Sequence, residues 1–318
     1  MDKRPFTAQE HQMTNFIYHH NDLDGYFSRE IVKKFIKTEF KEEAVCREIN
    51  YGMPFDDHDV DHEEDRVFVV DFCIQPTKQM LKLIEETEKN LTWIDHHKTS
   101  VELIEENPWI PEKCNVVVES GKKAACELCW EYLFPNEQTP VNVQLISQYD
   151  VWNHDGPFDW LDYVEPFKLF METREITEKE LEKLSNEELH SLIFIGKCIR
   201  EHSRKIDKSI MLENSHELRL RVPGTKKEYY TIVLNSAKRG SRQFTSTYPP
   251  LKFDLMLSYR NTKGNYWTIG LYSENKKVDC SDIAKRIGAA GKFGPGGGHK
   301  GAAGCQVDTE TLVKILKL

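Results

Sequence analysis

The feature that most constrains this chain is a series of short apolar runs in its first half, separated by amphipathic stretches. Strand-like runs lie at residues 15–19, 66–71 and 91–95, and helix-like stretches lie at 25–40 and 76–89. Strands that alternate with amphipathic helices are typical of βαβ units, which build a parallel sheet. The first half therefore predicts an α/β domain with a parallel sheet.

The second half of the chain has a different pattern. Residues 175–215 are rich in Glu, Lys and Leu with helical periodicity, and short strand-like runs separated by turn residues begin at Leu218. The length of 318 residues suits two domains of about 100–200 residues each. We expect a parallel-sheet domain at 1–190, a helical linker at 191–214 and a smaller, mixed α/β domain at 215–318.

The charge balance disfavours one class of partner. The chain has 52 Asp and Glu residues against 43 Lys and Arg residues, for a formal net charge of -9. This balance argues against a broad basic face for long duplex nucleic acid, but it leaves room for a local pocket that binds a small anion. The start of the chain has no signal-peptide pattern, and no long uncharged apolar run follows, so we expect a cytoplasmic protein without membrane contact.

Two groups of cysteine or histidine residues could suggest metal binding, but neither is expected to bind a metal. The pair Cys126 and Cys129 lies in a helix-like stretch with no second ligand pair nearby, so buried thiols are favoured over zinc or redox chemistry. The charge-dense segment 55–65 contains His58 and His62 but no apolar framework, and a solvated loop is favoured there.

Acidic and histidine residues follow each of the three strand-like runs. They are His20, Asp22 and Asp24 after the first run, Asp71 at the end of the second, and Asp95, His96 and His97 after the third. The carboxyl ends of parallel strands meet at one sheet edge, where open α/β sheets bind ligands. Taken alone, Asp22 or Asp24 is explained as well by a helix N-cap or first-turn position. Together, however, the carboxylates would repel one another without cations, so we expect a metal cluster.

The ligand types favour manganese. Carboxylates suit Mg²⁺ and Mn²⁺, and added imidazoles shift the preference toward a transition ion. We therefore expect two Mn²⁺ ions, with Co²⁺ or Mg²⁺ as alternatives. Two ions that share a carboxylate can generate a hydroxide and clamp a phosphoryl centre. Asp71, which stands alone at the end of a central strand, is the expected bridge.

These motifs resemble those of the DHH-type phosphoesterases, which are named for the triplet seen here as Asp95-His96-His97. The segment 20–25 resembles the family's first motif, Asp71 its second and Asp150 its fourth, and residues 215–318 resemble its DHHA1-type lobe. The resemblance thus implies a catalytic DHH domain followed by a substrate-binding DHHA1 domain.

The resemblance also implies a ligand set and roles for single residues. One ion would be bound by His20, Asp22 and Asp71, and the other by Asp24, Asp71, His96 and Asp150. Asp95 and His97 would be catalytic, with His97 contacting substrate phosphate and Asp95 orienting the imidazoles. Two alternatives stay open at this stage, namely His19 in place of His20, and Asp155 or Asp159 in place of Asp150.

A glycine-rich segment near the C-terminus contains Gly296, Gly297, Gly298 and His299, followed by Lys-Gly-Ala-Ala-Gly. So many glycines predict neither helix nor strand but a loop whose N–H groups cradle an anion. The DHHA1-type lobe carries a similar Gly-Gly-Gly-His motif, which implies that these four residues bind substrate. The family's compact glycine run is here longer by one residue and contains Pro295.

A second departure concerns the nanoRNases of the family. They carry an arginine that pairs with a terminal phosphate where this chain has Tyr272. Three arginines are candidates to replace it, although solvation is the favoured role of each: Arg239, Arg242 and Arg260. Three aromatic residues are candidates for a base platform, although core packing is favoured for each: Tyr248, Tyr259 and Trp267.

The whole pattern predicts a nanoRNase (oligoribonuclease-like, NrnA/NrnB type) that hydrolyses short oligonucleotides to mononucleotides by attack of a metal-activated hydroxide. A cyclic-dinucleotide or adenosine 3′,5′-bisphosphate phosphohydrolase is the alternative enzyme. The alternative from another class is a degenerate family member that binds nucleotide without chemistry. The expected partner is a short oligonucleotide or small nucleotide, and a homodimer is left open.

Overall fold

The computed structural model describes residues 13–50, 53–236, 240–249, 251–262, 266–275, 277–294, 296–298 and 300–317. The chain divides into two compact units, Met1–Ile199 and Arg200–Leu318. Helix α8 (Asn186–Asn214) runs across this division. The domain boundaries expected from the sequence therefore stay a prediction, and each unit is described on its own. No helix in the described ranges is long and apolar enough to cross a lipid bilayer.

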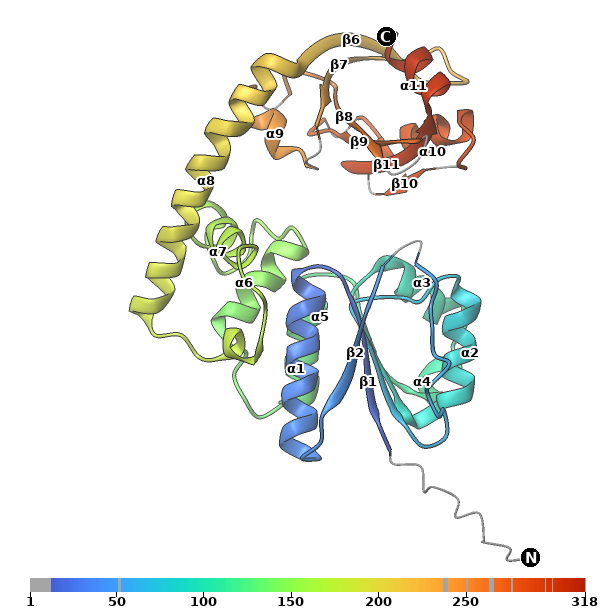
Figure 1. Cartoon of the computed structure of the whole chain (residues 1–318), viewed down its shortest axis with the longest axis vertical. Helices are drawn as coiled ribbons and strands as arrows, with labels where there is room; N and C mark the ends of the chain where they lie inside the picture. The colour runs from blue at the N-terminus through green and yellow to red at the C-terminus, as the bar shows by residue number, and fades with distance from the viewer. Residues whose placement is uncertain are drawn as a thin grey trace, which may run out of the picture. The chain divides into compact units, whose positions relative to one another are not determined.

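A five-stranded parallel sheet is the centre of the first unit (Figure 1). The strand order is β2-β1-β3-β4-β5, and every neighbouring pair is parallel. The strands are β1 (Asn15–His20), β2 (Ala44–Ile49), β3 (Arg66–Val70), β4 (Leu91–Asp95) and β5 (Asn115–Val118). Strands β1, β3 and β4 are thus neighbours, and their carboxyl ends meet at one edge.

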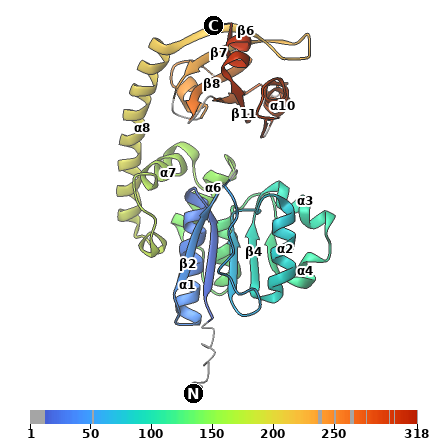
Figure 2. The ribbon, with the colours of Figure 1, turned by 45° about the vertical axis from the view of Figure 1, so that its right-hand side comes forward.

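Helices cover both faces of this sheet (Figure 2). Helices α1 (Leu23–Glu39), α5 (Ala125–Leu133) and α6 (Val141–Asp150) pack on one face, where Ile17 of β1 joins their core. Helices α2 (Thr77–Thr87), α3 (Lys98–Glu106) and α4 (Ile110–Lys113) pack on the other, around Phe16 and Tyr18. Because successive side chains of a strand alternate between faces and both faces are buried, β1 reads as a continuous apolar run.

The remaining helical elements of the first unit are short. They are the 3₁₀ helix η1 (Glu88–Asn90) before β4 and, after α6, the π-helix η2 (Trp160–Val164), α7 (Glu165–Met171) and the 3₁₀ helix η3 (Glu178–Leu181).

The second unit contains a six-stranded mixed sheet of order β10-β11-β9-β8-β7-β6, in which β7 and β8 pair parallel and the other neighbours antiparallel. Its strands are β6 (Ser215–Arg221), β7 (Glu228–Asn235), β8 (Leu255–Thr262), β9 (Tyr266–Tyr272), β10 (Gly297–Gly298) and β11 (Ala302–Asp308). Its helices are α9 (Arg242–Thr245), α10 (Cys280–Ala290) and α11 (Thr309–Leu316), and α10 and α11 contribute Ile283 and Leu312 to a core with Leu257. The expected α/β fold, with a parallel sheet followed by a mixed sheet, is confirmed.

The expected strands at 15–19, 66–71 and 91–95 are present as β1, β3 and β4, but the two edge strands β2 and β5 were not predicted from the sequence. Most side chains of β2 are exposed or half-buried, and those of β5 are half-buried throughout. Edge strands need no continuous apolar run, so the sequence gives a weak signal there.

The prediction that the glycine-rich segment forms no strand is wrong at two positions. Gly297 and Gly298 pair antiparallel with Gly304 and Ala303 of β11. A Cβ atom on Gly298, whose φ is 137°, would lie 2.6 Å from the Cα of Ala303. The neighbouring strand therefore supplies the pairing that the sequence does not indicate, and glycine permits the close approach.

Candidate metal centre

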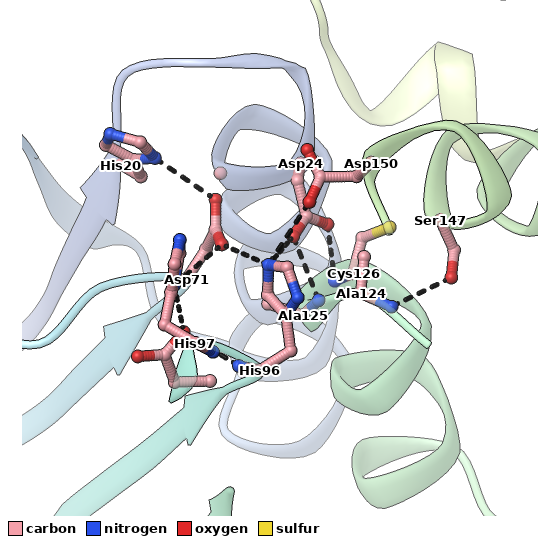
Figure 3. Close-up of polar contacts among 12 residues, drawn as sticks. His20, Asp24, Asp71, His96, His97, Ala124, Ala125, Cys126, Ser147 and Asp150 are labelled. Carbon is pink, nitrogen blue, oxygen red and sulfur yellow. Dashed lines mark hydrogen bonds and ion pairs between the residues drawn. The ribbon is translucent and has the colours of Figure 1, made fainter. Parts of the chain in front are cut away.

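The candidate ligands gather at the carboxyl edge of the parallel sheet, as Figure 3 shows. His20 ends β1, Asp71 follows β3, and His96 follows β4. Asp71 has a φ of 56°, in the left-handed region that aspartate tolerates better than most residues. Its backbone N–H still donates to the carbonyl oxygen of Ile94, at 2.9 Å, so the turn is held against the neighbouring strand.

The first group consists of His20, Asp22 and Asp71. His20 Nδ1 lies 2.9 Å from Asp22 Oδ2 and 3.6 Å from Asp71 Oδ2. Asp22 is also the N-cap of α1, because its Oδ1 accepts a hydrogen bond from the N–H of Gly25 at 3.0 Å. The capping role and the site position are therefore compatible. A Cβ atom on Gly25 would overlap the carbonyl group of His20, so glycine is needed where α1 starts against β1.

The second group surrounds His96 Nε2. This atom lies 3.5 Å from Asp24 Oδ2, 3.3 Å from Asp71 Oδ1 and 3.2 Å from Asp150 Oδ2. Asp71 thus turns Oδ2 toward the first group and Oδ1 toward the second. This is the arrangement of a carboxylate that bridges two cations.

The alternative ligands differ in how close they lie to these two groups. His19 is buried, its Nδ1 lies 2.9 Å from the carbonyl oxygen of His20, and its ring packs against Tyr26. Alternation along β1 turns it away from the edge cluster. Asp159 caps the π-helix η2, and neither it nor Asp155 belongs to a described group of potential ligands. His20 and Asp150 are the residues that the structure brings together with the others.

The donor set fits divalent cations. Both carboxylate oxygens of Asp71 and the Nε2 of His96 are buried without a hydrogen-bond partner among the described residues. Burial and the neighbouring carboxylates of Asp24, Asp22 and Asp150 raise the pKa of Asp71 well above its usual value. Buried polar atoms without partners are rare in folded proteins, and cations between these groups would satisfy them.

The partners of His96 and of Asp22 shift the pKa of each group toward its charged form. Burial acts to lower the pKa of His96, but the nearby carboxylates of Asp150 and Asp24 raise it to about 9. Burial acts to raise the pKa of Asp22, but the hydrogen bond and charge of His20 lower it to about 2. Without metal, a proton on His96 therefore partly neutralises the surrounding carboxylates.

Asp95 is fully buried and its carboxylate is occupied by donors. It accepts hydrogen bonds from the backbone N–H groups of His96 and His97, at 2.7 and 3.3 Å, and from the hydroxyl of Ser100. The Nδ1 of His97 lies 2.7 Å from the same carboxylate. The ring of His97 is therefore fixed with its Nε2 directed away from Asp95, and the side chain is 27% exposed.

One contact of the site had no signal in the sequence. The carboxylate of Asp24 accepts hydrogen bonds from the backbone N–H groups of Ala125, at 2.9 Å, and Cys126, at 2.8 Å (Figure 3). These groups are among the free N–H donors at the start of α5. The thiols of Cys126 and Cys129 are buried and free, as expected, so the helix contributes through its backbone and not through the Cys pair.

The segment 55–65 is a loop, as expected, and its His62 lies near two carboxylates. His62 Nε2 lies 3.4 Å from Asp57 Oδ2 and 3.7 Å from Glu86 Oε2. These groups are partly exposed, and Lys82 also pairs with Glu86. His58 is exposed and pairs with Asp56.

The predicted substrate-binding residues lie in the second unit. Gly296, Gly297 and Gly298 are exposed or half-buried at the edge of its sheet, whereas His299 and Arg239 lie outside the described residues. The hydroxyl of Tyr272 accepts a hydrogen bond from the N–H of Gly240 at 2.9 Å.

The fold is similar to that of a solved structure at low sequence identity. A solved structure described as the DHH domain of a member of a family of ribosomal proteins is 16% identical, with a TM-score of 0.58 over 96% of this chain and 86% of that one. The exonuclease RecJ bound to manganese is 14% identical, with a TM-score of 0.49 over 96% and 88%. RecJ from Thermus thermophilus in complex with Mn²⁺ is also 14% identical, with a TM-score of 0.48 over 96% and 51%.

No curated protein matches the sequence. A family model matches the part of the chain where the three strand ends meet, and its description agrees with the Asp-His-His triplet. Residues 14–149, which hold every candidate metal ligand except Asp150, match the DHH family, N-terminal domain.

Proposed function

We propose that this protein is a metal-dependent phosphodiesterase that hydrolyses short oligonucleotides to mononucleotides. The observation that carries the proposal is the position of Asp71. Its two buried carboxylate oxygens face separate groups of His and Asp side chains, and neither has a hydrogen-bond partner in the described structure. Such a constellation is expected where two cations share a carboxylate, as in two-metal phosphoesterases and nucleases.

The ligand assignment follows from the two groups. His20, Asp22 and Asp71 would bind one ion, and Asp24, Asp71, His96 and Asp150 would bind the other. Mixed carboxylate and imidazole donors favour Mn²⁺, with Co²⁺ or Mg²⁺ as alternatives. When bound, two such ions supply activation of water at neutral pH and compensation of the charge at a phosphate.

Residues that are not metal ligands are assigned to binding and orienting the substrate. Asp95 holds His97 through Nδ1, which leaves Nε2 available to donate to a phosphate oxygen of the substrate. Burial acts to lower the pKa of His97, but the hydrogen bond and charge of Asp95 raise it, which favours the donor form. We therefore assign His97 to substrate contact and Asp95 to its orientation. By the family resemblance, Gly296, Gly297, Gly298 and His299 bind the rest of the substrate.

The proposed preference for short substrates rests on the charge balance of the chain. Long duplexes are bound through many phosphate contacts, and in this chain the 43 Lys and Arg residues are outnumbered by 52 Asp and Glu residues, so the chain has no excess of positive charge for such contacts. The free state of all eight cysteines suits a reducing compartment, and we place the reaction in the cytoplasm.

The alternative hypothesis, a degenerate protein that binds nucleotide without catalysis, is weakened because all six candidate ligands come together.

The test is steady-state hydrolysis with Mn²⁺. Labelled RNA of two to five nucleotides should be cleaved with a kcat/KM roughly ten times that of a 24-mer or more, with weak dependence on salt. Comparable values for the 2-mer and the 24-mer would contradict the proposed length preference. Preferential opening of a cyclic dinucleotide would favour the alternative enzyme. If none of these substrates is hydrolysed, the proposed phosphodiesterase activity is contradicted.

A further inference from the structure

Four aromatic rings, one in the last turn of α6 and three in the segment that follows it, form one cluster. Tyr149 stacks on Trp160, with ring centroids 5.3 Å apart and planes at 15°, and His154 stacks on the same indole at 3.9 Å. Trp152 stands edge-on to Trp160, at 5.0 Å and 89°. We call these four residues the aromatic platform.

The exposure and backbone of Trp152 are unusual. Its side chain is 59% exposed, although an indole gains free energy from burial. Its φ is 57°, in the left-handed region that bulky residues rarely adopt. The supporting Trp160 begins a π-helix, a conformation that is rare and frequent at functional sites. Neither packing nor backbone preference explains why a large ring is held in this position.

One residue of the aromatic platform, Tyr149, connects it to the candidate metal centre. Tyr149 lines a cavity of about 450 Å³ whose wall also includes the candidate ligands Asp22, Asp24 and Asp150. This volume lies within the range of small-molecule sites. Trp152 follows Asp150 by two residues, so the ligand and the exposed ring belong to one short segment.

Two cations line the same cavity. Lys168 Nζ lies 4.7 Å from the centre of the Tyr149 ring and 2.6 Å from Glu172 Oε1, and Arg174 pairs with Glu180 at 3.4 Å. The cavity therefore combines carboxylates, cations and an aromatic wall. This combination suits a nucleotide, which has anionic phosphate and a flat base.

We propose that the aromatic platform, with Trp152 as its exposed face, stacks a nucleobase of the substrate whose phosphate lies at the metal centre. This inference rests on the proposed function and adds a base-binding site in the first unit. Stacking on an aromatic ring tolerates every base, so the site would favour nucleotides without selecting sequence. The aromatic residues considered from the sequence do not compete for this role, because Tyr248, Tyr259 and Trp267 pack against the cores of the second unit.

The test measures binding without turnover. The probe is a dinucleotide that has methylene in place of the bridging 3′-oxygen, and its binding to the Mn²⁺-loaded full chain is measured by isothermal titration calorimetry. A second probe lacks both bases but keeps both sugars and the phosphonate. Trp152→Ala should weaken binding of the base-containing probe about tenfold and leave binding of the abasic probe unchanged. Trp152→Phe should restore most of the affinity.

Tyr132→Ala is the matched control, since Tyr132 is another exposed ring of the first unit and lies on α5, outside the cavity. It should bind both probes as the wild type does. The aromatic platform is refuted if Trp152→Ala keeps the wild-type preference for the base-containing probe, or if the wild type has no such preference. The proposed function fails by a separate result, namely a wild-type protein that binds the probes but hydrolyses no natural dinucleotide with Mn²⁺.

Discussion

The backbone N–H of Cys126 donates a hydrogen bond to Oδ1 of Asp24, 2.8 Å away, across 102 positions of sequence. Oδ2 of the same carboxylate accepts from Ala125 and lies 3.5 Å from His96 Nε2. Asp24 is therefore shared between the N-terminus of α5 and the candidate metal centre. The positive end of a helix dipole favours the ionised carboxylate there, whereas burial raises its pKa.

Replacement of Asp24 by Asn should destabilise the metal-free protein. An amide can accept only one of the two N–H groups, and its own NH₂ would face the other. The expected cost is about 1–3 kcal/mol, the penalty for an unsatisfied buried group. Urea unfolding in the presence of chelator measures it. Asp279→Asn is the matched control, because Asp279 caps α10 in the same way and Asn caps a helix as well as Asp does, so stability should change by less than about 0.5 kcal/mol. Equal stabilities of the two variants would contradict the dual role of Asp24.

Replacement of Asp71 by Asn should stabilise the metal-free protein and remove metal binding. The pKa of Asp71 is raised in the folded state, so its ionisation opposes folding as pH rises above the unfolded value. At pH 7 the variant should be more stable than the metal-free wild type, by about 0.5–2 kcal/mol. The gain should shrink as the pH falls toward 4 and disappear near about pH 3, where the wild-type carboxyl is protonated in both states. Urea unfolding across this pH range checks this, and a variant that is less stable at pH 7 would contradict the electrostatic account.

Metal binding should release protons. The pKa of His96 is about 9 without metal, so at pH 7 the imidazole must lose a proton before it can bind a cation. Apparent affinity for Mn²⁺ should therefore rise with pH from 6 to 9, by at most about tenfold per pH unit for each proton released. Calorimetric titration in two buffers of different ionisation enthalpy gives the number of protons. Binding at pH 7 without proton release would contradict the raised pKa of His96 in the metal-free protein.

Asp95→Asn should lower turnover without removing metal. The amide cannot accept from both the ring of His97 and the hydroxyl of Ser100, so the His97 ring loses its fixed orientation. Loss of such an orienting partner typically costs about 10–100-fold in activity or metal affinity. Because Asp95 orients His97 and contributes no ligand, we expect the loss in kcat with two Mn²⁺ ions still bound. Equal loss of bound metal and of turnover would place Asp95 among the ligands instead.

The part of the site that could be predicted from the sequence is the part built by single strands. Buried parallel strands need continuous apolar runs, so β1, β3 and β4 were visible, and the charged residues at their ends marked the edge where ligands meet. His20, Asp71 and His96 were found in this way. Strands β2 and β5 were missed because edge strands need only a few buried side chains.

The rest depends on contacts between distant segments. No local pattern shows that the N–H groups of α5 hold Asp24, because backbone donors are the same for every residue. The aromatic platform was missed because Trp160 and His154 have no visible link to Asp150 until the fold stacks Trp160 between His154 and Tyr149, the neighbour of Asp150. Gly297 and Gly298 were missed as a strand because pairing with β11, and not side-chain alternation, defines them.

The most direct test of the central claim is the location of metal ions by anomalous diffraction. Crystals of the full chain grown with Mn²⁺ are measured at the manganese edge. The structure predicts two peaks about 3.5–4 Å apart, with Asp71 between them, His20 and Asp22 beside one, and Asp24, His96 and Asp150 beside the other. The Asp71→Asn crystal should lack both peaks. A wild-type crystal with no peak beside Asp71, or with manganese only at Asp57, His62 and Glu86, would contradict the assignment.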